Sequence, residues 1–230
     1  LIMKLRTPMK LSDRTINLLR NFSTINQSIL FKKGTKLRTI SVMKNILAEA
    51  NVDEDFPHDF AIYDLPQFLN QVNLFKEPEF HFNSQTSVKL REDGDEAVAF
   101  FADPSVIVSP PEKSIELPSV DVEFTLKTAQ FDKLRKAAAV SHLDDWSVIG
   151  KDGKIFLQVH DRKNDTSNGF STLVGKTDKT FAMHFKVENI KIIPGSYEVK
   201  ISRKLLSEFK SIEYDLTYYI ALEPDITWEE

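Results

Sequence analysis

A weak internal repeat is the feature of this sequence that most constrains its fold. FAIYD at Phe60 is matched by FAMHF at Phe181, and ILFKKGTK at Ile29 is matched by SVIGKDGK at Ser147. After each copy of the first motif, a helical pattern is followed by strand-like segments. The repeat predicts two copies of one domain, each built from two βαβββ units. The alternative is a chance similarity between segments rich in β-forming residues.

Strand patterns dominate the rest of the chain and predict the α+β class. Dipeptides that favour tight hairpin turns lie between β-rich runs: Asp93-Gly94, Asp152-Gly153 and Asn168-Gly169. The neighbouring segments of strand length are Ser87–Arg91, Ala97–Ala102, Lys154–Val159 and Tyr197–Ile201.

Four segments show helical spacing of apolar residues instead. They are Met9–Ile25, Leu65–Lys76, Lys127–Leu143 and Lys186–Ile193. The predicted N-caps of the first three are Ser12 or Asp13, Asp64, and Thr128.

A proline-rich stretch separates the two halves. Residues 102–120 contain four prolines and predict an extended connector. The expected domains are residues 9–103 and 120–230, joined by residues 104–119. The chain has no Met at position 1 and contains MKL twice, so Leu1–Pro8 is expected to be an extension outside the fold.

Charge is distributed unevenly between helices and strands. The net charge of −4 predicts no overall attraction to nucleic acid or to acidic membranes. The four predicted helices, however, hold only three of the 34 acidic residues and ten of the 30 basic ones. Lys and Arg are good helix formers, but Glu is equally good, and Glu188 is the only one in these segments. The interpretation that we favour is that the helices face a common polyanion while the sheets face solvent.

Common catalytic and cofactor motifs are missing from the sequence. The absence of cysteine excludes disulfides, thiolate zinc sites and cysteine nucleophiles, and weakly favours a reducing cytoplasm. No GxGxxG, GxxxxGK[ST], HExxH or GxSxG occurs, and no apolar run approaches the roughly 18 residues of a membrane span. The sequence therefore gives no sign of a catalytic residue, metal, cofactor or membrane contact.

Two weaker functional hypotheses stay open. A hydrolase would use the pairs His58-Asp59 and His160-Asp161 or the SHLDD run at His142, but adjacent strand residues point to opposite faces. A single-strand nucleic-acid-binding module that forms no ring would stack bases on Phe100-Phe101 or Tyr218-Tyr219, although inward packing explains one member of each pair.

Several motifs are specific enough to suggest a family. They are MKLSDRTINLLRNFSTINQSILFKKG, ILAEANV, DFAIYDLPQFL, ADPSVIV, IIPGSYEVKI and YYIALEPD. Together they resemble the sliding clamps of T4-type bacteriophages, which are DNA polymerase processivity factors. The resemblance runs from Met9 to Glu223, whereas residues 160–180 and the tail ITWEE depart from the family pattern.

The resemblance implies a DNA-clamp fold with two similar domains, each of two βαβββ units, with sheets outside and helices lining a ring. It implies that three subunits close head to tail, so that twelve helices surround duplex DNA. The expected function is a non-enzymatic tether for the replicative polymerase, loaded by an ATP-driven clamp loader and also used in late transcription. The expected location is the cytoplasm of the infected bacterial host.

The resemblance and the charge pattern together suggest three groups of site residues. The residues expected to face DNA are Lys10, Arg14, Arg20, Lys127, Lys133, Arg135, Lys136, Lys186 and Lys191. The residues implied for partner binding are Val106, Ile107, Val108, Leu222, Pro224 and Ile226. The residues implied for subunit contact are Ala97, Phe100, Phe101, Ser171 and Leu173.

Overall fold

The computed structural model describes residues 7–229 and divides the chain into two compact units. Unit 1 runs to Glu112 and unit 2 starts at Lys113. The boundary falls inside the predicted connector 104–119. Most of the predicted extension, residues 1–6, lies outside the described residues. No helix within the described range is long and apolar enough to cross a membrane.

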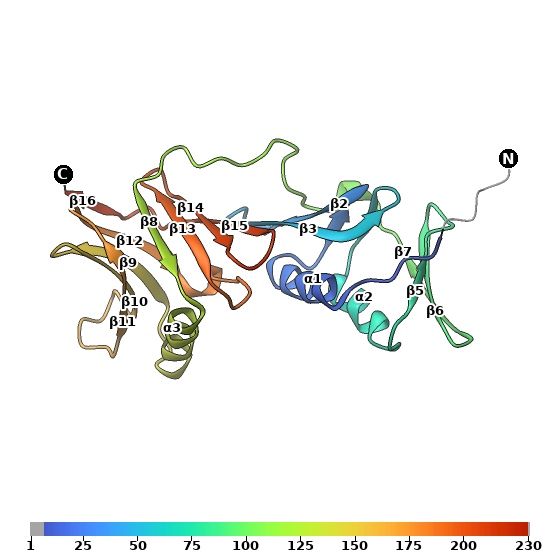
Figure 1. The fold of residues 1–230 in the computed structure, drawn as a ribbon, viewed down its shortest axis with the longest axis horizontal. Helices are drawn as coiled ribbons and strands as arrows, with labels where there is room; N and C mark the ends of the chain where they lie inside the picture. The colour runs from blue at the N-terminus through green and yellow to red at the C-terminus, as the bar shows by residue number, and fades with distance from the viewer. Residues whose placement is uncertain (1–6, 230) are drawn as a thin grey trace. The chain divides into compact units, whose positions relative to one another are not determined.

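Unit 1 packs two helices against short sheets (Figure 1). The helices are α1 (Asp13–Ile25) and α2 (Leu65–Val72), and a 3-10 turn, η1, covers Pro104–Val106. The paired strands are β1 (Ile29–Phe31) with β4 (Phe60–Ile62), and β2 (Gly34–Ile40) with β3 (Ile46–Phe56). A third sheet has the order β5 (Glu79–His81), β6 (Ser87–Glu92), β7 (Asp95–Phe100). Stacked Phe31 and Phe60, whose ring centroids are 4.4 Å apart, form part of the core.

Unit 2 packs one longer helix, α3 (Thr128–Val140), and a 3-10 turn, η2 (Val187–Asn189), against two sheets (Figure 1). The first sheet has the order β11 (Phe170–Lys176), β10 (Lys154–His160), β9 (Asp145–Lys151), β12 (Thr180–Lys186), β16 (Thr227–Glu229). The second follows the order β15 (Leu216–Ala221), β14 (Leu206–Ser211), β13 (Tyr197–Ser202), β8 (Val122–Leu126). Buried Phe131 of α3 lies 5.8 Å from Trp146 between ring centroids and anchors the helix.

The two units repeat one order of elements. In unit 2 the order is β8, α3, β9 to β12, η2 and β13 to β15, and β8 pairs with β13. In unit 1 a bridge from Met9 to Phe80 of β5 takes the place of the β8–β13 pairing, and the order from α1 to β7 is the same. The internal similarity predicted from the sequence therefore corresponds to a structural repeat.

Helices α1 and α2 begin where their predicted capping residues indicate, and the observed helices differ from the predicted ranges. The Ser12 hydroxyl accepts the Thr15 N–H at 3.2 Å, so α1 begins at Asp13, and the predicted start at Met9 is wrong because Met9 is extended. Asp64 caps α2 by accepting the Gln67 N–H at 2.9 Å, as predicted, but the helix ends at Val72 rather than Lys76. In α3, Thr128 is the first helical residue and Lys127 occupies the cap position.

The fourth predicted helix, Lys186–Ile193, is wrong. Lys186 is the last residue of β12, where it pairs with Asp145 of β9, and only Val187–Asn189 form a 3-10 turn. The Lys186 ammonium also donates to the Asp145 carboxylate at 2.7 Å. Val187 and Ile190 have a spacing that suits a helix, but these contacts with β9 keep the chain extended through Lys186.

Two of the three predicted hairpin turns are confirmed. Asp93 and Gly94 have φ values of 49° and 95°, and Asp152 and Gly153 have 52° and 77°. Positive φ at both central residues is the requirement of a type I′ turn. Asn168-Gly169 does not form such a turn, since it ends the longer loop of residues 161–169 between β10 and β11.

Candidate nucleic-acid interface

Two arginines of unit 1 project from α1 and are held by neighbouring polar groups. The Arg14 guanidinium donates to the backbone carbonyl of Asn51 at 3.1 Å. The Arg20 guanidinium donates to the Asn73 side-chain oxygen at 2.8 Å and so ties α1 to the end of α2. Neither contact neutralises the positive charge, because both acceptors are uncharged.

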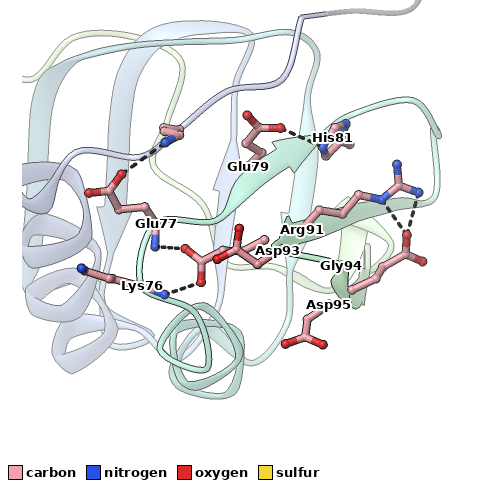
Figure 2. Close-up of a pocket in the computed structure, with 11 residues that line it drawn as sticks. Lys76, Glu77, Glu79, His81, Arg91, Asp93, Gly94 and Asp95 are labelled. Carbon is pink, nitrogen blue, oxygen red and sulfur yellow. Dashed lines mark hydrogen bonds and ion pairs between the residues drawn. The ribbon is translucent and has the colours of Figure 1, made fainter.

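Lys10 lies in a different environment, because it lines an open pocket of about 780 Å³. Figure 2 shows this pocket, with Lys76 and Glu77 among its labelled residues. The Lys10 ammonium pairs with the Glu77 carboxylate at 3.2 Å. The Glu92 carboxylate accepts the backbone N–H groups of Lys76 and Glu77 at 2.8 and 2.5 Å, and these two bonds lower the pKa of Glu92. The pocket thus belongs to a surface of mixed but largely acidic charge. Through Glu92, this surface holds the turn that follows α2 by hydrogen bonds.

The exposed face of α3 carries the clearest positive charge. Phe131, Leu134 and Ala138 point into the core of unit 2, and the exposed basic residues of the helix are Lys133, Arg135 and Lys136. The Arg135 guanidinium lies 5.7 Å from the centroid of the Phe131 ring. Among the described residues, no carboxylate forms an ion pair with these three side chains or with Lys127.

Lys186 and Lys191 differ from the basic residues of α3. Asp145, the partner of Lys186, is only 2% exposed. The hydrogen bond to Asp145 is the main reason why the pKa of Lys186 is raised. Lys191 is half-buried beyond η2. The positive charge of Lys186 is therefore neutralised by Asp145 inside unit 2. Lys186 is accordingly expected to contribute less positive charge to an outer surface.

The observed helix bounds weaken the charge asymmetry without abolishing it. The three α-helices contain two acidic residues and five basic residues. The acidic residues are Asp13 and Asp132. The basic ones are Arg14, Arg20, Lys133, Arg135 and Lys136. Helix α2 carries no charged residue.

The predicted partner-binding residues of unit 1 lie next to an apolar turn that sequence reasoning missed. Val106 is 56% exposed and Ile107 is buried. The Asn26 side-chain amide donates to the Val108 carbonyl at 3.1 Å and to the Ile40 carbonyl at 2.9 Å. This amide brings the connector entrance beside the β2–β3 turn. The apolar residues of that turn, Val42 and Met43, are 65% and 82% exposed. Two consecutive apolar residues at the tip of a hairpin were the signal from which the sequence could have predicted this apolar surface.

The predicted partner-binding residues of unit 2 follow β15. Leu222 is buried and donates its N–H to the Leu205 carbonyl at 3.0 Å, Pro224 is exposed, and Ile226 is half-buried. Asp225, between the last two, forms an ion pair with Arg162 of the β10–β11 loop. This segment is thus fixed at both ends, with an exposed proline between the contacts.

The predicted subunit-contact residues lie on edge strands, since β7 and β11 each end the strand order of their sheet. Phe100 is 76% exposed and Leu173 is 49% exposed. Ala97 is half-buried on β7, and Ser171 is exposed on β11. Phe101 differs, because its ring packs 4.8 Å from Phe60 between centroids.

The His-Asp dipeptides do not form acid/base pairs. The His58 Nδ1 lies 3.0 Å from the Asp59 backbone carbonyl rather than from its carboxylate, and His142 is exposed. His160 and His184 both lie 2.7 Å from the Ser147 hydroxyl. Within residues 7–229, no group of three or more His, Asp and Glu side chains is arranged to hold a metal ion.

Family models match both halves of the chain. The model described as DNA polymerase processivity factor matches residues 10–108, and the one described as gp45 sliding clamp, C terminal, matches residues 123–224. The sliding clamp of Vibrio phage KVP40 is 31% identical over 94% of this chain and 99% of the relative. The chain belongs to the family of T4-type phage sliding clamps. The sliding clamp of Enterobacteria phage T4 is also 31% identical, over 95% of this chain and 99% of the relative.

Solved structures show the same clamp fold at low sequence identity. Proliferating Cellular Nuclear Antigen from Entamoeba histolytica matches with a TM-score of 0.67 at 15% identity, over 90% of this sliding clamp and 94% of the other chain. The predicted α+β two-domain clamp fold and the family resemblance are confirmed, and the chain is a DNA polymerase processivity factor.

Proposed function

We propose that three copies of this chain close head to tail into a ring that encircles duplex DNA and holds the replicative polymerase on it. The observation that carries the proposal is the uncompensated basic face of α3, together with Arg14 and Arg20 of α1. Cations that meet phosphates without reading bases bind duplex DNA independently of sequence and allow sliding. The ring would be lined by nine α-helices rather than the twelve expected from the sequence, because η2 replaces the fourth helix of each described chain.

Edge strands supply the means of closure. Strand β7 of one subunit would pair with β11 of the next, and Phe100 and Leu173 would bury their exposed surface there. This contact is heterologous, so it forms a closed ring only if each rotation between subunits is one third of a turn. Pairing would also cover two strand edges that are otherwise open to aggregation.

Partner proteins would dock on apolar surface of each unit. On unit 1 we propose that the docking surface consists of Val106 and Val108, extended by Val42 and Met43. On unit 2 we propose that it consists of Leu222, Pro224 and Ile226. We also propose that an ATP-driven clamp loader opens the ring in the cytoplasm of an infected bacterial host, and that the clamp supports late transcription. The clamp would perform no chemistry of its own, and retention would be topological, which raises the effective concentration of polymerase at its template.

The test combines solution mass with DNA topology. Light scattering at micromolar protein is expected to give the mass of three subunits, about 79 kDa from a chain of 26.4 kDa. Protein loaded on a nicked circle should stay bound after dilution and should leave within seconds once the DNA is linearised. Equal retention on linear and circular DNA would contradict topological binding and favour a single-strand-binding module instead.

A further inference from the structure

The last strand, β16, is a short segment added to the open edge of β12. Thr227, Trp228 and Glu229 pair antiparallel with Ala182, Phe181 and Thr180. The residues that lead into β16 include exposed Pro224 and Asp225. Three residues supply few backbone hydrogen bonds, so side chains must contribute most of the stability of β16.

Trp228 provides the main side-chain contact. Its ring stacks on Phe181 with centroids 5.1 Å apart and an angle of 13° between planes. The Arg203 guanidinium lies 4.8 Å from the Trp228 ring, and Arg203 is held in turn by Asp121 at 3.1 Å. An aromatic platform and a positioned cation therefore lie beside an open backbone edge.

We propose that the β12 edge, Phe181 and Arg203 form a docking site for an extended peptide of a partner protein, and that β16 occupies this site in cis. The peptide would carry an aromatic residue followed by an acidic one. Thr227-Trp228-Glu229 shows what the site accepts, because it binds as an added strand whose tryptophan meets the platform. The acidic residue corresponds to Glu229, which pairs with Thr180.

Cis occupancy sets the affinity that a partner must exceed. A tethered segment on a short linker competes at an effective concentration in the millimolar range. A partner peptide would displace β16 only if it bound more tightly or was itself held close by another contact. This inference goes beyond the proposed polymerase tether, and it needs neither DNA nor ring closure to be tested.

The probe is a fluorescein-labelled synthetic peptide of residues 223–229, added to full-length protein and followed by fluorescence anisotropy. Trp228→Ala is expected to weaken β16 and to bind the probe at least about tenfold more tightly than the wild type does. Tyr63→Ala, which removes an aromatic residue 66% exposed in unit 1, should bind like the wild type. A probe with alanine in place of tryptophan should bind none of these proteins.

Two double variants test whether the aromatic platform, Phe181, and the cation, Arg203, each contribute to peptide binding. Adding Phe181→Ala or Arg203→Ala to Trp228→Ala should reduce binding at least about tenfold for the platform and severalfold for the cation. Arg203 is exposed, so its variant stays informative if loss of buried Phe181 disturbs folding. Equal binding to wild type and Trp228→Ala, or no binding to Trp228→Ala, would overturn the proposal. A solution mass that is higher for the wild type than for Trp228→Ala, and that excess probe lowers, would also overturn the proposal. The occupant of the site would then be β16 of a second copy.

Discussion

At the scale of single residues, buried Glu54 of β3 is the main anchor of the start of α1. Its carboxylate accepts the Ser12 N–H and the Thr15 hydroxyl, both at 2.6 Å, and Glu54 is only 7% exposed. Burial raises the pKa of Glu54, but the hydrogen bonds from Ser12 and Thr15 outweigh it and leave the pKa below 4.5. The ionised form is therefore the one that stabilises the fold.

Glu54→Gln is expected to reduce the free energy of unfolding by about 1–3 kcal/mol at pH 7, because the charged acceptor of one buried and one partly buried hydrogen bond is removed. Since the folded pKa is depressed, the contribution of Glu54 is present above pH 4.5 and disappears as pH falls through the lower folded value. Urea unfolding at pH 7 and pH 3 measures both effects. Asp53→Asn, at the exposed neighbouring position on β3, should behave like the wild type.

A second residue-scale prediction concerns His184, which shares the Ser147 hydroxyl with His160. Burial, with a smaller effect of the Arg162 charge, lowers the pKa of His184 from 6.5 to about 4. Between these values the unfolded chain binds a proton that the folded chain does not. The stability of unit 2 should therefore fall by about 1–2 kcal/mol between pH 7 and pH 5.

His184→Asn keeps a hydrogen-bonding group near Ser147 but removes the titrating imidazole. We expect urea midpoints of this variant to change less between pH 7 and pH 5 than those of the wild type. His142→Asn, on an exposed residue, is the matched control and should retain the wild-type slope. An unchanged pH dependence in His184→Asn would show that another group carries the effect.

At the scale of elements, α3 is expected to carry most of the DNA attraction. Arg135→Glu with Lys136→Glu should reduce polymerase processivity on primed circular DNA and flatten its dependence on salt, by about one unit of log–log slope for each phosphate that is no longer neutralised. The exposed pair Lys151→Glu with Lys154→Glu, on the β9–β10 hairpin, makes the same charge change away from any helix. Equal effects of the two pairs would show that net charge, rather than α3, governs DNA binding.

Predictability also differs between elements. Helices α1, α2 and α3 were predictable because local signals agree, with side-chain caps at Ser12 and Asp64 and an apolar stripe behind each. The segment after Lys186 was not, since its local spacing suits a helix while its contact with Asp145 on a distant strand decides the outcome. The same reason limits the site: a sequence shows that Lys10 and Lys186 are basic, but not that Glu77 and Asp145 lie beside them.

At the scale of the whole molecule, the proposed ring would close through exposed apolar residues at sheet edges. Phe100→Asp is expected to lower the solution mass from three subunits toward one, because a charge would be buried without a partner in the β7–β11 contact. Ile212→Asp, at a residue 54% exposed in a loop of unit 2, introduces the same charge away from either edge and should leave the mass unchanged. Persistence of the full mass in Phe100→Asp would exclude β7 from the contact.

The short turn η2 has a consequence for how DNA would travel through the proposed ring. In that ring, phosphates that pass α3 would meet three cations, whereas those that pass η2 would meet a surface where Lys186 is already neutralised by Asp145. The potential inside the bore would then have three-fold corrugation, with attractive sectors separated by shallow barriers. Diffusion of the clamp along the duplex should accordingly be slower than in a uniformly charged bore, and it should accelerate as salt flattens the corrugation.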